Sequence, residues 1–115
     1  RIKQDENGIA DVFGEVQDSW LTERLEHSSA SWRVFASSVS LAPMIVDLSS
    51  VDELDQDLRN KYYLNLDQFD GFRFQKESLL NKLRSSPTII ISGDIHSTFV
   101  TDHHGVVEFT GASVS

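Results

Sequence analysis

The residues best suited to chemistry follow a run of three isoleucines. Ile89–Ile91 leads directly into Ser-Gly-Asp-Ile-His-Ser at 92–97. Three consecutive β-branched residues are typical of a strand buried on both faces, and open α/β sheets bind ligands where such strands end. Gly93 permits a sharp exit, and on extended backbone Asp94 and His96 would share one face. A carboxylate and an imidazole together can ligate calcium, iron, manganese or zinc.

A structural role is the alternative for Asp94 and His96. An aspartate can close a turn through its own backbone, and a backbone carbonyl can satisfy a histidine. The motif Asp-x-His has only three letters. The residues alone therefore leave both interpretations open.

A second candidate is the segment 65–72, where acidic, amide and aromatic residues alternate before Gly71 and Phe72. Its spacing does not fit an EF-hand loop, which requires a glutamate at the twelfth position. Counting from Asn65 places Lys76 there, and counting from Asp67 places Ser78 there. The simpler interpretation is a polar loop that caps the next helix, with Phe69 and Phe72 as anchors.

The other titratable residues are assigned to turns and surfaces. The pair His103-His104 before Gly105 predicts a turn between two strands, although a metal-binding role is the alternative. Glu108 alternates with apolar neighbours, so we expect it in solvent or at the rim of a site. His27 follows Glu26 at the end of a predicted helix, where a positive charge interacts favourably with the helix dipole.

The elements that must position these residues alternate between helix and strand. Apolar spacing and turn residues predict a helix from Glu15 to about Ser28, a strand over Trp32–Ser37, a solvated acidic loop with one helical turn over 47–61, a helix from Phe72 through Arg84, a strand at Ile89–Ile91, and a hairpin of Thr98–Asp102 against Val106–Thr110. This order predicts an α/β fold with a mixed sheet and covering helices.

Composition narrows the class of protein. The 115 residues suffice for one small domain. Eighteen acidic against ten basic residues give a net charge of -8, which disfavours binding to a nucleic-acid backbone. No apolar run approaches the roughly 20 residues of a membrane span, and the lack of cysteine excludes disulfides and thiolate zinc sites. Since no P-loop or nucleophile elbow is present, a hydrolase built on this sequence would need a metal-activated water.

The order of several segments resembles the C-terminal part of the catalytic domain in PhoD-like alkaline phosphatases and phosphodiesterases, a branch of the metallophosphoesterase superfamily. The matching segments are the Gln17, Trp20-Leu21, Leu25 and Ser28 pattern, Trp32–Val34, the Pro43 region, 65–72 with Leu79-Leu80, 92–97, Glu108–Thr110 and Ser113–Ser115. Phe69 stands where the family tends to have tryptophan, Phe72 where tyrosine is usual, and Lys76 near a usual arginine.

The resemblance implies that residues 1–115 are a single fragment, the C-terminal half of a four-layer α-β-β-α sandwich. It also implies a phosphoric ester hydrolase that uses calcium and iron, with manganese and zinc as alternatives. Asp94 and His96 would be metal ligands, and Asp67 and Asp70 would lie near the site as ligands or as carboxylates that support them. Metals in such enzymes hold phosphoryl oxygens and generate a hydroxide that attacks phosphorus. Catalytic and substrate-binding residues are left unassigned.

The resemblance further implies an exported protein, periplasmic or secreted, whose N-terminal half supplies the remaining ligands. We therefore expect the 115-residue chain alone to be inactive and to need that half as a partner. A different interpretation is a non-catalytic module of the same fold, which binds a divalent cation or a protein partner.

Overall fold

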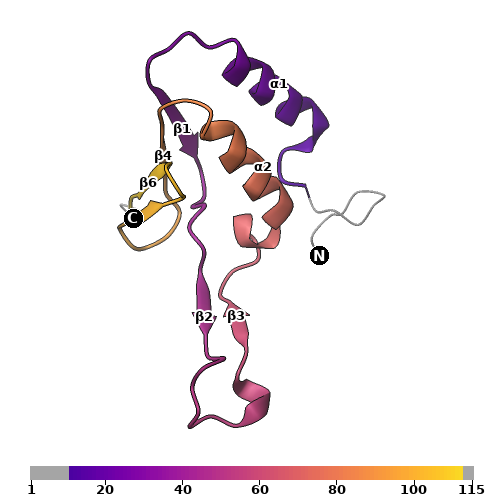
Figure 1. Ribbon diagram of the computed structural model, residues 1–115, viewed down its shortest axis with the longest axis vertical. Coiled ribbons are helices and arrows are strands. Elements are labelled where there is room, and N and C mark those ends of the chain that lie inside the picture. Colours follow the sequence, from indigo (N-terminus) through magenta and orange to yellow (C-terminus); the bar gives the residue numbers. More distant parts are fainter. Residues whose placement is uncertain (1–10, 113–115) are drawn as a thin grey trace.

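The computed structural model describes residues 11–112. Four strands form one mixed sheet in the order β1-β4-β6-β5, and two short strands form a second sheet (Figure 1). In chain order the elements are α1 (Gly14–Glu26), β1 (Arg33–Ser37), β2 (Ile45–Asp47), the 3-10 turn η1 (Gln56–Leu58), β3 (Lys61–Tyr63), the 3-10 turn η2 (Phe69–Gly71), α2 (Arg73–Leu83), β4 (Thr88–Ser92), β5 (Phe99–Asp102) and β6 (Val107–Thr110).

The direction of the strands brings three strand ends to one edge of the sheet. β1 pairs with β4 in parallel, β4 pairs with β6 in parallel, and β5 closes the sheet antiparallel to β6. The last residues of the three parallel strands, Ser37, Ser92 and Thr110, therefore lie at one edge. We call this the carboxyl edge. The predicted mixed sheet with covering helices is confirmed.

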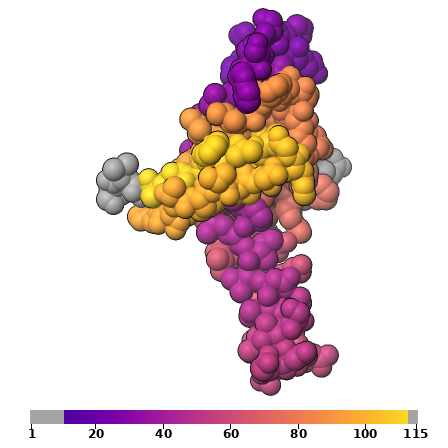
Figure 2. Space-filling view, turned by 60° about the vertical axis from the view of Figure 1, so that its left-hand side comes forward, coloured from indigo at the N-terminus to yellow at the C-terminus, as the bar shows by residue number. Residues whose placement is uncertain are grey.

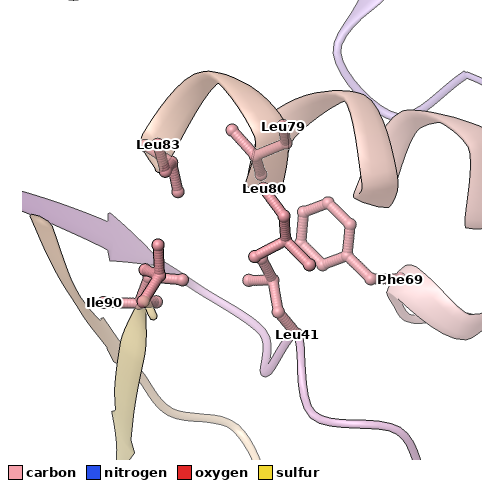
Figure 3. Close-up of a cluster of buried hydrophobic side chains, with 7 residues drawn as sticks. Leu41, Phe69, Leu79, Leu80, Leu83 and Ile90 are labelled. Atoms are coloured by element: carbon pink, nitrogen blue, oxygen red, sulfur yellow. The ribbon is translucent and has the colours of Figure 1, made fainter. Parts of the chain in front are cut away.

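Both predicted helices are present, and α2 supplies three of the seven residues of the buried core. Its leucines recur at helical spacing and face the sheet, whereas α1 contributes only half-buried side chains. The buried cluster, shown in Figure 3, comprises Leu41, Phe69, Leu79, Leu80, Leu83, Ile90 and Val106. No helix among residues 11–112 is long and apolar enough to cross a membrane.

The predicted hairpin at the end of the chain is also confirmed. His104 and Gly105 occupy its tip with φ of 56° and 101°, and the His103 amide donates to the Val106 carbonyl at 2.9 Å. Two consecutive residues with positive φ are typical of the tight turns whose twist matches that of the paired strands.

The prediction that the isoleucine strand is buried on both faces is wrong. Ile90 is 0% exposed, but the neighbouring Ile91 is 44% exposed. Side chains alternate between the faces of a sheet, and both helices pack on the face that carries Ile90. No element of residues 11–112 covers the other face, so its apolar side chains reach solvent.

The acidic stretch is exposed as predicted, and η1 is its one helical turn. No sequence pattern predicted the arm, the two-stranded sheet of β2 and β3 with the loop between them. Ile45 pairs with Tyr63 and Asp47 with Lys61 in antiparallel register. Figures 1 and 2 show the arm as a narrow extension, in magenta, away from the main sheet.

Candidate functional site

The loop that follows β4 leaves the carboxyl edge with Asp94 and His96 both exposed. Two backbone amides fix the neighbouring chain: the Gly111 amide donates to the Ser92 carbonyl at 2.9 Å, and the Ala112 amide donates to the Thr98 hydroxyl at 3.2 Å. The predicted metal-ligating residues therefore lie at the carboxyl ends of the strands, where open α/β sheets bind small molecules. Their role as ligands remains a prediction.

The backbone at Asp94 differs from the extended form that the sequence suggested. Its φ is +71°, in the left-handed region, and residues 95–97 bend. The two side chains are therefore not related by the alternation of a strand. A left-handed aspartate is uncommon and mildly strained, and such residues concentrate at functional sites.

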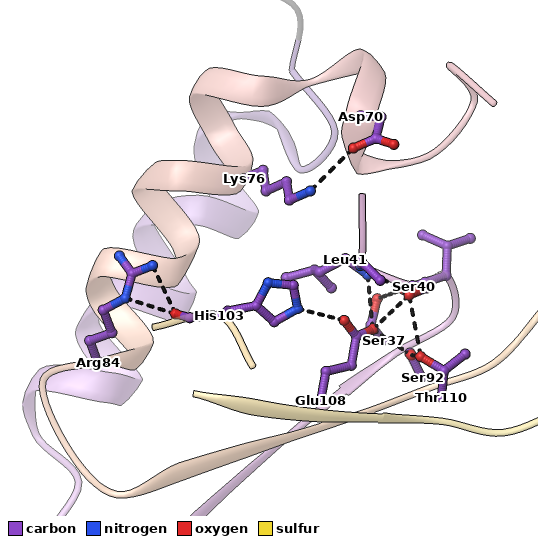
Figure 4. A network of polar contacts seen from close by, with 12 residues as sticks. Ser37, Ser40, Leu41, Asp70, Lys76, Arg84, Ser92, His103, Glu108 and Thr110 are labelled. Atoms are coloured by element: carbon purple, nitrogen blue, oxygen red, sulfur yellow. Dashed lines mark hydrogen bonds and ion pairs between the residues drawn. The ribbon is translucent and has the colours of Figure 1, made fainter. Parts of the chain in front are cut away.

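A buried carboxylate lies beneath this edge (Figure 4). Glu108 is 0% exposed. Its Oε1 accepts hydrogen bonds from the Ser92 hydroxyl at 2.5 Å, the Leu41 amide at 2.9 Å and the Ser40 hydroxyl at 3.0 Å. Its Oε2 lies 2.7 Å from Nε2 of His103. One side chain thus joins the end of β4, the loop after β1 and the terminal hairpin.

The hydrogen bonds keep this carboxylate ionised. Burial by itself raises the pKa of Glu108, but the donors His103, Ser92, the Leu41 amide and Ser40 outweigh it and lower the pKa from 4.5 to about 2. An ionised carboxylate only accepts hydrogen bonds. Nε2 of His103 therefore carries a hydrogen and donates a hydrogen bond to Oε2 of Glu108.

The expectation that Glu108 lies in solvent or at a rim is wrong. The alternation of β6 is as predicted, but the face that Glu108 shares is the one that the helices cover. His103 does stand at the predicted turn, yet its ring points inward and is buried. One signal was available: a glutamate and a histidine flank a tight turn on paired strands, close enough to bond across it.

The segment 65–72 forms a loop and η2 before α2, and Phe69 anchors it in the core as the simpler interpretation predicted. The predicted capping is wrong, because the N-cap of α2 is Phe72 and no side chain makes a capping hydrogen bond there. Asp70 is buried: its Oδ1 lies 3.2 Å from Nζ of Lys76, and its Oδ2 accepts the Met44 amide at 2.7 Å. Asp67 is exposed, and its amide donates to the Asn65 side chain at 2.9 Å. The two Asp70 contacts tie α2 to the residue that precedes the arm. The role of the two aspartates beside a metal remains a prediction.

The described residues do not form a complete metal site. Within 11–112, no three histidine, aspartate or glutamate side chains gather closely enough to hold an ion. Structural zinc takes four ligands and calcium six to eight. Asp94 and His96 can therefore supply at most part of a site, and the fit of calcium or iron to this chain alone is incomplete.

Comparison with known proteins now adds a family. The model of the PhoD-like phosphatase family matches residues 2–115. The chain belongs to this family. Over 106 residues the PhoD-like chain is 24% identical to alkaline phosphatase D of Bacillus subtilis (strain 168). The matched segment is 90% of this chain but only 16% of the relative. No solved structure matches it. The family inferred from the order of the motifs is confirmed; Ser113–Ser115, the last of them, lie outside the described residues.

Proposed function

We propose that this PhoD-like chain is part of a hydrolase of phosphate mono- or diesters. The observation that carries the proposal is the placement of the Asp94 and His96 loop at the ends of parallel strands, with Asp94 in a left-handed conformation. Family membership and the likeness to an alkaline phosphatase support the same class of reaction.

In this proposal Asp94 and His96 are two ligands of a metal centre whose other ligands lie outside residues 11–112. Calcium with iron is the proposed pair, with manganese and zinc as alternatives. The buried Glu108 network supports the proposal, because Ser92, which it holds, directly precedes the Gly93-Asp94 exit. Asp67 and Asp70 are proposed to lie near the same centre.

We also propose that a second sheet covers the uncovered side of β1-β4-β6-β5, as in an α-β-β-α sandwich. Four apolar residues support this: Val34, Ile91, Val100 and Phe109 are 60%, 44%, 63% and 48% exposed. Sheets that pack face to face bury such residues between them. The chain spans 16% of the matched relative, so this layer and the whole activity belong to the intact protein.

Two substitutions in the intact protein test the function. Asp94→Asn and His96→Ala should lower bound metal and the hydrolysis of an aryl phosphate together, the latter by at least about a hundredfold, since removing even a neighbour of a ligand costs 10- to 100-fold. The matched controls are Asp57→Asn and His27→Ala, which change exposed residues of the acidic loop and the end of α1. Elemental analysis that finds unchanged metal in both test variants would refute the ligand assignment.

The second candidate is a non-catalytic module that binds a cation or a protein. The incomplete ligand group and the uncovered apolar face favour it. The same assay separates the two functions: an intact protein that binds metal through His96 but hydrolyses neither monoesters nor diesters is the module.

A further inference from the structure

A cleft of about 270 Å³ lies between the first half of α1, the end of β1 and η2. Its walls are apolar and aromatic, and its rim carries small polar groups from Gln17 and Ser38. None of the described residues that line it is charged. The protein has a net charge of -8, but the described residues of this cleft offer a ligand no charged side chain to pair with. The cleft is therefore suited to an uncharged, apolar part of a ligand.

The walls are held in place before any ligand arrives. Phe69 is 2% exposed, and Phe13 packs edge-on against it with ring centroids 6.0 Å apart. Trp20 stands at the opening, 55% exposed, with the Arg24 guanidinium 6.0 Å from its ring centroid. A large aromatic side chain that lines a cleft and is half open to solvent is suited to stacking against another ring.

The cleft adjoins the candidate site. Ser37 and Ser38 line it, and Ser37 is paired in register with Ser92, the residue before Gly93-Asp94. The apolar cleft and the Asp94 loop therefore lie at the ends of neighbouring parallel strands, on the same edge of the sheet.

We propose that this cleft binds the aromatic or apolar alcohol group of a phosphate ester while the phosphate points toward Asp94. The inference rests on the proposed function for the phosphate and on the cleft itself for the organic group. Its size fits one or two fused rings, because a cavity of about 150 Å³ holds benzene and larger drug-like ligands need about 300 Å³ or more.

The first test measures binding without catalysis. Equilibrium dialysis of 2-naphthol against the intact protein should show binding that Trp20→Ala weakens about tenfold, the effect of losing roughly one stacking contact. Trp32→Ala is the matched control, since Trp32 is 69% exposed and does not line the cleft. Equal binding by the two variants, or no binding by the wild type, would overturn the proposal.

A second variant guards against misfolding of the first. Ser38 is exposed at the rim, so Ser38→Trp narrows the cleft without displacing a core residue. It should weaken binding of 2-naphthol as Trp20→Ala does. Unchanged binding in Ser38→Trp contradicts the cleft as the binding site.

The second test separates this inference from the proposed function. For 2-naphthyl phosphate, Trp20→Ala should raise KM about tenfold and leave kcat unchanged, and for methyl phosphate it should change neither. If KM rises equally for both esters, the cleft does not bind the alcohol group of the ester, and the inference is wrong. If neither ester is hydrolysed but 2-naphthol still binds through Trp20, the hydrolase proposal fails and the cleft stands.

Discussion

The two faces of the four-stranded sheet have opposite environments, although neighbouring residues of the same strands form them. The covered face carries the row Phe35, Ile90, Glu108 and Thr101, and the open face carries the row Ala36, Ile91, Phe109 and Val100. Ile90 and Glu108 are 0% exposed, whereas Ile91, Phe109 and Val100 are between 44% and 63% exposed. The usual assignment is inverted for Glu108 and its neighbours on β6 and β4: this charged residue is inside with Ile90, whereas Ile91, Phe109 and Val100 are outside.

The inversion shows what each face requires. Glu108 can be buried because backbone and side-chain donors satisfy both of its oxygens, which offsets the cost of desolvation. The open face has no such compensation in water. A contiguous apolar row of this kind marks an interaction surface, so we expect it to be the side on which another layer packs.

The largest difference in stability should separate the truncation of Ile90 from the truncation of its neighbour Ile91. In the 115-residue chain Ile90→Ala should lower the free energy of unfolding by about 2–5 kcal/mol, and Ile91→Ala by less than about 1 kcal/mol. Urea unfolding measures both, and an Ile90→Ala chain that is already unfolded without urea sets a lower bound on its loss. Equal losses would contradict the difference between the faces. In the intact protein, a cost for Ile91→Ala that approaches that of Ile90→Ala would show that the open face is covered there.

The buried carboxylate gives the second prediction. Glu108→Gln places an amide NH₂ where at least one donor now points, so it should cost about 2–3 kcal/mol, in the range for a buried unsatisfied group. Thr101→Val, in the same row, is the control for a polar change on this face. A Gln variant as stable as the wild type would mean that the network contributes nothing.

The pH dependence sharpens this comparison. Because the pKa of Glu108 falls from 4.5 to about 2 on folding, its contribution to stability is fully present above the unfolded pKa and is lost as pH falls through about 2. The wild type should therefore lose more stability than Glu108→Gln between about pH 6 and about pH 2.5. Parallel curves of Tm against pH would be inconsistent with an ionised carboxylate in the core.

The smallest effect on stability concerns the open face. We expect the 115-residue chain to be marginally stable or to self-associate, and Val100→Lys should reduce association while changing stability by no more than about 0.5 kcal/mol. Ser50→Lys adds the same charge on the exposed arm and should leave association unchanged. Sedimentation equilibrium distinguishes them. Dissociation by both variants would indicate general charge effects, not contact through the open face.

The sequence by itself determined the order and type of the main elements and the location of the Asp94 and His96 loop. These depend on local rules: leucine spacing defines α2, β-branched residues define β4, and Gly105 permits the turn of the hairpin. The arm escaped prediction because its strands are only three residues long and gain stability from pairing across a loop.

Tertiary structure alone decided which face of the sheet is inside. Strand alternation separates Ile90 from Ile91 and Glu108 from Phe109, but it is symmetric between the two faces. The choice is made where α2 docks and where Ser40, 68 residues away in the sequence, reaches Glu108. The contacts with α2 and Ser40 have no local signature, and the one local signal, His103 across the turn, does not by itself say which face is covered; Glu108 was therefore expected at the surface and is held in the core.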